Sequence, residues 1–183
     1  MRAGAIILAA AFLLSLVPAG RCPATEAGIG LFADEARTRS LVTNPGGITQ
    51  FVMWIWVRPG DNGAICADYE IATPYNVIVS DIAPNPDAPV RVGEPVAPPG
   101  ISICFDECRT DWFWTYRVVF YVTDMELTRI TVEPHDTSGG TLITTCEPDN
   151  TTEPMCVFTD LYINYDFAVE EFSWGAVKRM LGD

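Results

Sequence analysis

Two pairs of tryptophans have a spacing that could bind sugar rings. Trp54 and Trp56 lie two residues apart, as do Trp112 and Trp114. In a strand such pairs share one face and lie about 7 Å apart, because each residue advances the strand by about 3.3 Å. Coplanar, exposed indoles at this spacing would form a stacking platform for carbohydrate. Large aromatic side chains usually pack in a core, so burial is the competing interpretation.

A hydrolytic centre is the second chemistry to consider. His135 is the only histidine, and its setting, PHDTSGG, is typical of a turn. A Ser-His-Asp triad could be drawn through it with Ser138 or Ser173, but the sequence has no G-x-S-x-G elbow to support one. We therefore expect His135 to be an exposed turn residue and the protein to be no enzyme, with a secreted hydrolase as the remaining alternative.

Acidic residues dominate the charge of the chain. The 24 Asp and Glu against 11 Lys and Arg give a formal net charge of −13. A nucleic-acid partner would need a basic patch, and the only lysine is Lys178. Asp106, Glu107 and Asp111 fall in one predicted turn, and such oxygens suit calcium, but no D-x-[DN]-x-[DN]-G loop occurs. We expect a solvated acidic turn and no cofactor, with a structural calcium ion as the alternative.

The six cysteines favour disulfides over metal ligation in an exported chain. Cys146 and Cys156 bracket a polar loop between two predicted strands. A bridge there would close the end of a hairpin, and we expect this pair to form. We also expect Cys66 to pair with Cys108 or Cys104.

Residues 1–24 have the pattern of a signal peptide. Arg2 precedes an apolar run at 6–17, and small residues follow. This run is shorter than the roughly 20 residues of a transmembrane helix, so we expect export to the periplasm or the extracellular space without a transmembrane anchor. Cleavage after Ala19 would retain Cys22, whereas cleavage after Ala24 would remove it and leave an unpaired cysteine. The even number favours the earlier cut.

The elements that must position these residues are organised around the stretch WFWTYRVVFYV at 112–122. Its period of two, without Gly or Pro, predicts a long strand with one face in a core. We expect that face to carry Trp112, Trp114, Tyr116, Val118, Phe120 and Val122. The other face, which includes Thr115, is expected to be half-exposed. Both faces of QFVMWIWV at 50–57 are apolar, so this strand is either central and covered on both sides or exposes apolar side chains for a function.

Turn signals separate further short strands. Together we expect nine or ten, at 28–33, 50–57, 64–71, 76–82, 90–92, 101–105, 112–122, 127–133, 141–146 and 156–165. The proline-rich stretch 84–100 is expected to be a loop with at most an edge strand at 90–92, and 106–111 a polar turn. The pattern predicts one all-β domain over 25–165, an antiparallel β-sandwich or barrel.

The C-terminal tail, 166–183, changes to a helical pattern, and Ser173 can cap a short helix over 174–181. The sequence VEEFSWGAVK at 169–178 resembles a V-E-x-x-[ST]-W-G-x-[VI]-K ending of uncharacterised secreted bacterial proteins. GLFAD at 30–34 and the strand at 118–123 resemble the β-sandwich of those proteins, which is similar to cohesin-type domains. The resemblance implies a nine-stranded, jelly-roll-like sandwich in an extracellular, non-catalytic protein, and it supplies no ligand or catalytic residues.

The sequence thus predicts an exported, non-catalytic β-sandwich that acts as a surface or matrix interaction module, with a protein or surface glycan as partner. The alternative is a carbohydrate-binding module that uses Trp54 and Trp56. Two roles remain open for the tail. Its helix could dock on the sandwich as a lid, or it could be a tether for sorting or attachment, which the general mobility of chain termini favours.

Overall fold

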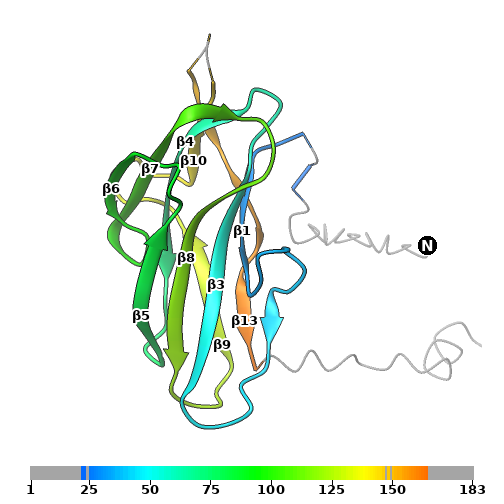
Figure 1. Cartoon of the computed structure of the whole chain (residues 1–183), viewed down its shortest axis with the longest axis vertical. Coiled ribbons are helices and arrows are strands. Elements are labelled where there is room, and N and C mark those ends of the chain that lie inside the picture. Colours follow the sequence, from blue (N-terminus) through cyan, green and yellow to red (C-terminus); the bar gives the residue numbers. More distant parts are fainter. Residues whose placement is uncertain (1–21, 24, 147, 149, 165–183) are drawn as a thin grey trace, which may run out of the picture.

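The computed structural model describes residues 22–23, 25–146, 148 and 150–164, and these form an all-β sandwich of two sheets (Figure 1). The expected fold class is confirmed. Residues 1–21 and 24 of the predicted signal peptide and the whole predicted C-terminal helix lie outside the described residues. One sheet has five strands in the order β12 (Cys156–Thr159), β1 (Gly28–Phe32), β3 (Thr49–Arg58), β8 (Phe113–Val122) and β5 (Val77–Pro84).

The second sheet is built around β4 (Ala64–Ala72), which pairs with three other strands. These are β7 (Ala97–Arg109), β9 (Thr128–Glu133) and β10 (Leu142–Thr144). The sheet is completed by β6 (Val90–Glu94), β11 (Thr152–Pro154), β13 (Leu161–Ile163) and β2 (Leu41–Val42). Most pairs are antiparallel as predicted, but β1 with β12 and β13 with β2 are parallel.

Residues 50–57 have one buried and one half-buried face, so the first of the two alternatives for this strand, full cover on both sides, is not found. Met53, Ile55 and Val57 of β3 are completely buried between the sheets. Trp54 and Trp56 alternate with them and point outward, where both are half-buried. The apolar residues on both faces of 50–57 therefore belong to a strand whose outer face is covered by side chains of its own sheet and of loops. No third layer of structure covers it among the described residues.

The alternation predicted for 112–122 is wrong at one point, because β8 contains a bulge. The register of β3 against β8 shifts between Ile55 and Trp56, so that Thr115 is the extra residue. Thr115 and Tyr116 are consecutive and both are buried. Trp112 and Trp114, which were predicted to share the core face with Tyr116, are consequently half-buried on the outer side, and Phe113 is buried instead.

A hydroxyl pair between the sheets accounts for the burial of Thr115. The hydroxyl of Tyr69, on β4, lies 2.6 Å from Oγ1 of Thr115, which in turn lies 3.3 Å from the carbonyl oxygen of Ile55. Thr115 can donate to this carbonyl while it accepts from Tyr69. Burial raises the pKa of the Tyr69 hydroxyl well above its usual value, so it stays protonated and available as a donor.

Strand β7 is longer than predicted at both ends. Its first residues include Pro98 and Pro99, which belong to the stretch predicted to be a loop. The strand tolerates them because the pairing of β6 with β7 shifts between Gly93 and Glu94, and prolines are accepted at such irregularities. At the other end Arg109 still pairs with Ala64, so the predicted turn at 106–111 is wrong over 106–109. The predicted edge strand at 90–92 is found as β6.

The strand predicted at 156–165 is divided between the two sheets. β12 belongs to the five-stranded sheet and β13 to the other, and Asp160 stands at the crossing. Its buried carboxylate accepts a hydrogen bond of 2.9 Å from Nε of Arg129. A buried charge needs such a partner, and the pair stabilises the position where the chain leaves one sheet for the other.

Three disulfides link Cys22 with Cys156, Cys66 with Cys104, and Cys108 with Cys146. The predicted Cys146–Cys156 pair is wrong, because Cys156 begins β12 in the opposite sheet whereas Cys146 follows β10. Cys66 pairs with Cys104, one of its two expected partners. These two residues face each other directly in the β4–β7 pair, with Cα atoms 4.1 Å apart.

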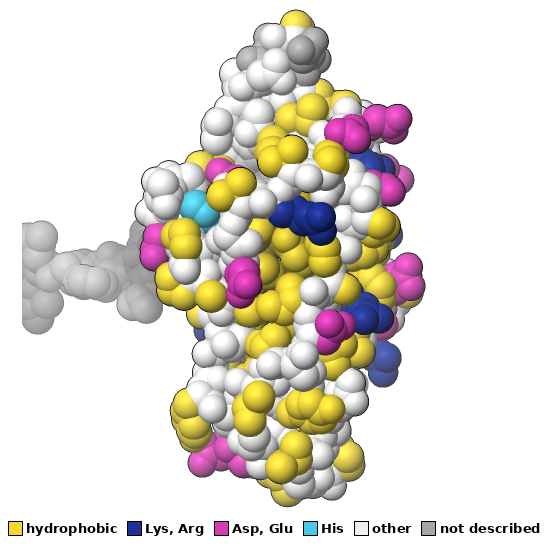
Figure 2. Space-filling model, turned by 60° about the vertical axis from the view of Figure 1, so that its left-hand side comes forward, with side chains coloured by type: hydrophobic (Ala, Val, Ile, Leu, Met, Phe, Trp, Pro, Cys, Tyr) yellow, Lys and Arg dark blue, Asp and Glu magenta, His cyan; other side chains and the backbone are white. Residues whose placement is uncertain are grey.

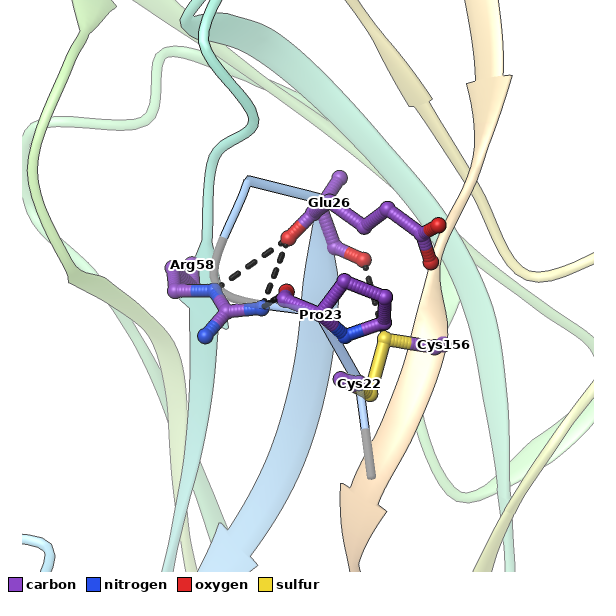
Figure 3. The surroundings of a disulfide bond; sticks show 6 residues. Cys22, Pro23, Glu26, Arg58 and Cys156 are labelled. Atoms are coloured by element: carbon purple, nitrogen blue, oxygen red, sulfur yellow. Dashed lines mark hydrogen bonds between the residues drawn. A yellow bond between two sulfur atoms is a disulfide. The ribbon is translucent and has the colours of Figure 1, made fainter. Parts of the chain in front are cut away.

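The Cys22–Cys156 disulfide ties the start of the described chain to the edge of the five-stranded sheet (Figure 3). Arg58 of β3 holds the same segment, because its guanidinium donates hydrogen bonds to the carbonyl oxygens of Pro23 and Glu26. The backbone N–H of Cys156 donates to the carbonyl of Ala27, 3.1 Å away. Cys22 is therefore an integrated part of this corner of the fold.

We predict that Thr115→Val destabilises the protein more than Tyr69→Phe does. Valine leaves the buried Tyr69 hydroxyl without a partner, at about 2–3 kcal/mol, whereas phenylalanine leaves Thr115 bonded to Ile55, at about 1 kcal/mol. Denaturant unfolding of both variants and of the double variant measures this order. The double variant should be no less stable than Thr115→Val alone; a purely additive loss would contradict the coupling.

We also predict that the exported protein retains Cys22, because that residue forms a disulfide with Cys156. Cleavage after Ala19 satisfies this requirement and cleavage after Ala24 does not. The intact mass of the secreted protein, measured before and after reduction, checks both the start of the chain and the number of disulfides. A chain that starts at Thr25 and carries a free thiol would contradict the prediction.

Candidate interaction surface

Four loop segments meet at one end of the sandwich, the lower end in Figure 1. They are the segment before β3 (43–48), the β4–β5 loop (73–76), the β8–β9 loop (123–127) and Asn164 after β13. These loops carry the most exposed large apolar side chains of this end: Ile48 at 73%, Tyr75 at 84%, Met125 at 64% and Leu127 at 64% exposure. Figure 2 shows hydrophobic side chains gathered at this lower end. We call these four side chains the apolar tip.

Asn44 fixes the first of these loops from within. It is almost completely buried, and its side-chain amide donates to the carbonyl oxygen of Asp124 at 2.9 Å. Its Oδ1 accepts hydrogen bonds from the N–H of Gly46 at 3.0 Å and from the hydroxyl of Thr49 at 2.6 Å. Its own backbone N–H donates to Oδ1 of Asn164 at 2.7 Å. Through its side chain and its backbone N–H, this one buried residue connects three of the four segments.

Asn76 does the same for the β4–β5 loop. Its buried amide donates to a carboxylate oxygen of Asp124 at 2.9 Å and to the hydroxyl of Thr128 at 2.6 Å. Beside it, the Tyr75 hydroxyl donates to the carboxylate of Glu126 at 2.6 Å. This hydrogen bond to an acceptor anion raises the pKa of Tyr75. The tyrosine ring is thus exposed but oriented.

The arrangement suits binding and not bond-breaking chemistry. The buried, hydrogen-bonded amides of Asn44 and Asn76 give the loops a fixed shape. Exposed apolar side chains at fixed positions can be buried by a partner without much loss of conformational freedom. The only charged residues of 43–48, 73–76 and 123–127 are Asp124 and Glu126. The surface is therefore apolar with an acidic component.

This surface was not predicted from the sequence. Asn76 and Leu127 were expected to begin strands at 76–82 and 127–133, whereas both lie in loops before β5 and β9. No binding role was assigned to the side chains of the apolar tip. The usable signal was the presence of Ile48, Tyr75, Met125 and Leu127 inside segments otherwise rich in Asn, Pro, Gly and Asp, because turn residues without a structural role are normally polar. The partners of the asparagines could not have been identified from the sequence.

The tryptophan pairs lie together on the outer face of the five-stranded sheet. The rings of Trp54 and Trp114 meet edge to face, with centroids 5.2 Å apart and planes at 88°. Trp56 and Trp112 are joined by Arg37, whose guanidinium carbon lies 4.6 Å and 4.7 Å from the two ring centroids. A sugar ring that stacked on the same face of Trp56 would have to displace Arg37. Carbohydrate binding by Trp54 and Trp56 stays a prediction.

His135 lies in a turn as expected, but it is buried rather than exposed. Its Nδ1 accepts a hydrogen bond of 3.2 Å from the backbone N–H of Ser138, and its backbone pairs with Gly140. The Ser138 hydroxyl has the Gly140 carbonyl as its partner, at 3.4 Å. These contacts hold the turn, and they do not form the nucleophile–base pair of a triad. Ser173 lies outside the described residues.

The acidic residues considered for calcium are dispersed along strand β7 and the turn after it. Asp106 and Glu107 are exposed on the strand, and the nearby carboxylate of Asp87 pairs with Arg109 at 3.1 Å. Within the described ranges no three His, Cys, Asp or Glu side chains are grouped as a metal site requires. A membrane-spanning helix is likewise not found in this part of the chain.

Comparison with known proteins supports the fold. No family model matches the chain, and no curated protein sequence matches it. Among solved structures, it is similar to the seventh ScaB type I cohesin from Pseudobacteroides cellulosolvens, with a TM-score of 0.51, 10% identity, and coverage of 75% of this chain and 90% of that one. It is also similar to a cohesin module of a Clostridium perfringens family 33 glycoside hydrolase (TM-score 0.50, 15% identity, 76% and 98% covered).

A third similar structure is the sixth cohesin from the scaffoldin B of Acetivibrio cellulolyticus, solved in complex with a Cel5 dockerin. It has a TM-score of 0.50 and 10% identity, and the alignment covers 78% of this chain and all of that one. The expected likeness to cohesin-type domains is confirmed at the level of fold. The described part of this chain is a cohesin-like β-sandwich.

Proposed function

We propose that this protein is an exported, non-catalytic interaction module that binds a protein partner through the apolar tip. The observation that carries the proposal is the combination of four largely exposed apolar side chains with loops locked by two buried asparagines. Exposed apolar patches on soluble domains commonly mark binding sites. A protein partner in the solved complex of the Acetivibrio cohesin agrees with this class of function.

An extracellular or periplasmic location is part of the proposal. Its support is the set of three disulfides, which form and persist in oxidising compartments, together with the leader-like sequence at 1–24. The C-terminal tail is proposed to be a tether that sorts or attaches the protein, as its sequence pattern suggests. The module would then be held at a surface while the apolar tip contacts the partner.

The acidic residues beside the apolar tip favour a partner whose contact surface is apolar at its centre and basic at its edge. Asp124 and Glu126 border the tip, and the chain has a formal net charge of −13. A cationic rim on the partner would be attracted to this end and would accelerate association at low salt. Membranes rich in anionic lipids would be repelled by the same charges.

Site-specific photo-crosslinking in exporting cells tests the proposal. A photoreactive residue at Met125, or in a second variant at Tyr75, should give one discrete adduct of constant mass with a protein. The matched control is Val92, an equally exposed apolar side chain on β6 at 66% exposure, which should give none. The same adduct from all three positions, or none from Met125 and Tyr75, would contradict the proposal.

A second set of variants in the crosslinking experiment distinguishes a loss of binding from a loss of folding. Changing Met125 and Leu127 together to serine, in a chain that carries the photoreactive residue at Tyr75, should remove the adduct. The melting temperature should change by less than a few degrees, because both side chains are exposed. A variant with Val90 and Val92 changed to serine should keep the adduct.

A further inference from the structure

A second potential site lies far from the apolar tip, on the outer face of the five-stranded sheet. Trp56 of β3 and Trp112, which precedes β8, flank the guanidinium of Arg37 at 4.6 Å and 4.7 Å. Both indoles are half-buried, and Arg37 of the loop 33–40 lies over both rings. Two aromatic faces directed at one cation form the arrangement that proteins use to bind guanidinium and quaternary ammonium groups.

Arg37 is held in this slot by the rings alone. Its guanidinium has no hydrogen bond or ion pair with any residue that the structure describes, although an arginine carries five donors. Arg58, one position further along the same aromatic row, differs in this respect. Its guanidinium carbon lies 4.3 Å from the ring centroid of Phe158 and 6.0 Å from that of Trp112, and the group also donates to the carbonyls of Pro23 and Glu26. Arg58 is thus fixed, whereas Arg37 can be replaced by another cation without loss of any hydrogen bond to the protein.

The loop that carries Arg37 has its shape set by another residue. The carboxylate of Asp34 accepts hydrogen bonds from the backbone N–H and the hydroxyl of Thr38, both at 3.0 Å, and from Nε of Arg39 at 3.2 Å. Arg37 itself has φ of 61°, in the left-handed region that side chains rarely adopt. The loop therefore stays formed when the Arg37 side chain leaves the slot, and its backbone favours glycine at this position.

The indole N–H of Trp56 is the remaining anomaly of the slot. It is buried and has no acceptor among the described residues. The closed arrangement with Arg37 thus leaves a polar group unsatisfied next to a cation that is bound weakly.

We propose that Trp56 and Trp112 form a binding slot for an organic cation, occupied at rest by Arg37 and open to exchange with the guanidinium of a partner's arginine. Arg37 acts as a tethered competitor, so an incoming cation must outcompete a group at high local concentration. The site goes beyond the proposed function, since it lies on a different face from the apolar tip and takes a different kind of ligand.

The test uses the full chain with Arg37→Gly, a substitution that removes the guanidinium and suits the positive φ. The probe is N-acetylarginine amide, and the readout is the set of indole N–H resonances, assigned with Trp56→Phe and Trp112→Phe. We expect saturable shifts of the Trp56 and Trp112 signals, with a Kd at least tenfold lower than for the parent chain. Arg39→Ala, which removes a neighbouring arginine that contacts Asp34 and no ring, should bind like the parent.

Two further probes identify the ligand class. Tetramethylammonium should also bind the Arg37→Gly variant saturably, because two aromatic faces attract quaternary ammonium as well as guanidinium groups. Methyl β-glucoside should not bind. Absence of saturable binding by Arg37→Gly, binding that persists when Trp112→Ala is added, or a response to the glucoside without one to the cations would each overturn the proposal.

Discussion

The β3–β8 pair has two apolar faces but only one opposing sheet to bury them, and the rest of the molecule is arranged around that imbalance. Met53, Ile55 and Val57 take the inner side and are completely buried. The bulge at Thr115 turns Trp114 away from the core and places a hydroxyl where Tyr69 of the other sheet can bond to it. The inner face thus contains a hydrogen-bonded hydroxyl pair between the sheets. The tryptophans of the β3–β8 pair lie on the outer face.

The tryptophans on the outer face are covered by neighbouring side chains and not by a third layer of structure. Trp54 and Trp114 pack against each other, and arginines from loops and strand ends lie over the remaining rings. Arginine suits this role because its flat guanidinium stacks on aromatic faces while its edges stay in water. The sheet therefore needs no partner to hide its tryptophans. The side chains of the apolar tip, at the lower end, are not covered in this way by any of the described residues. The loops that carry them are fixed by Asn44 and Asn76.

The positions of most strands could be predicted from the sequence, because alternation and turn residues are local signals. The errors share one cause, which is dependence on residues far away in the chain. Whether Thr115 is an extra residue depends on β3, and whether Cys156 reaches Cys146 or Cys22 depends on the sheet that β12 joins. The apolar tip shows the same limit, since the hydrogen bonds of Asn44 reach residues 80 and 120 positions away.

Amide hydrogen exchange of the purified protein tests most directly whether the lower end is a preformed surface. The backbone N–H groups of Gly46, Thr123 and Glu126 each donate to an asparagine or aspartate oxygen at this end, at 3.0 Å. The account predicts that they exchange slowly compared with the amides of a free peptide, although they lie in loops. Exchange at the rate of an unstructured chain would mean that the apolar side chains sit on mobile loops, and it would contradict the account.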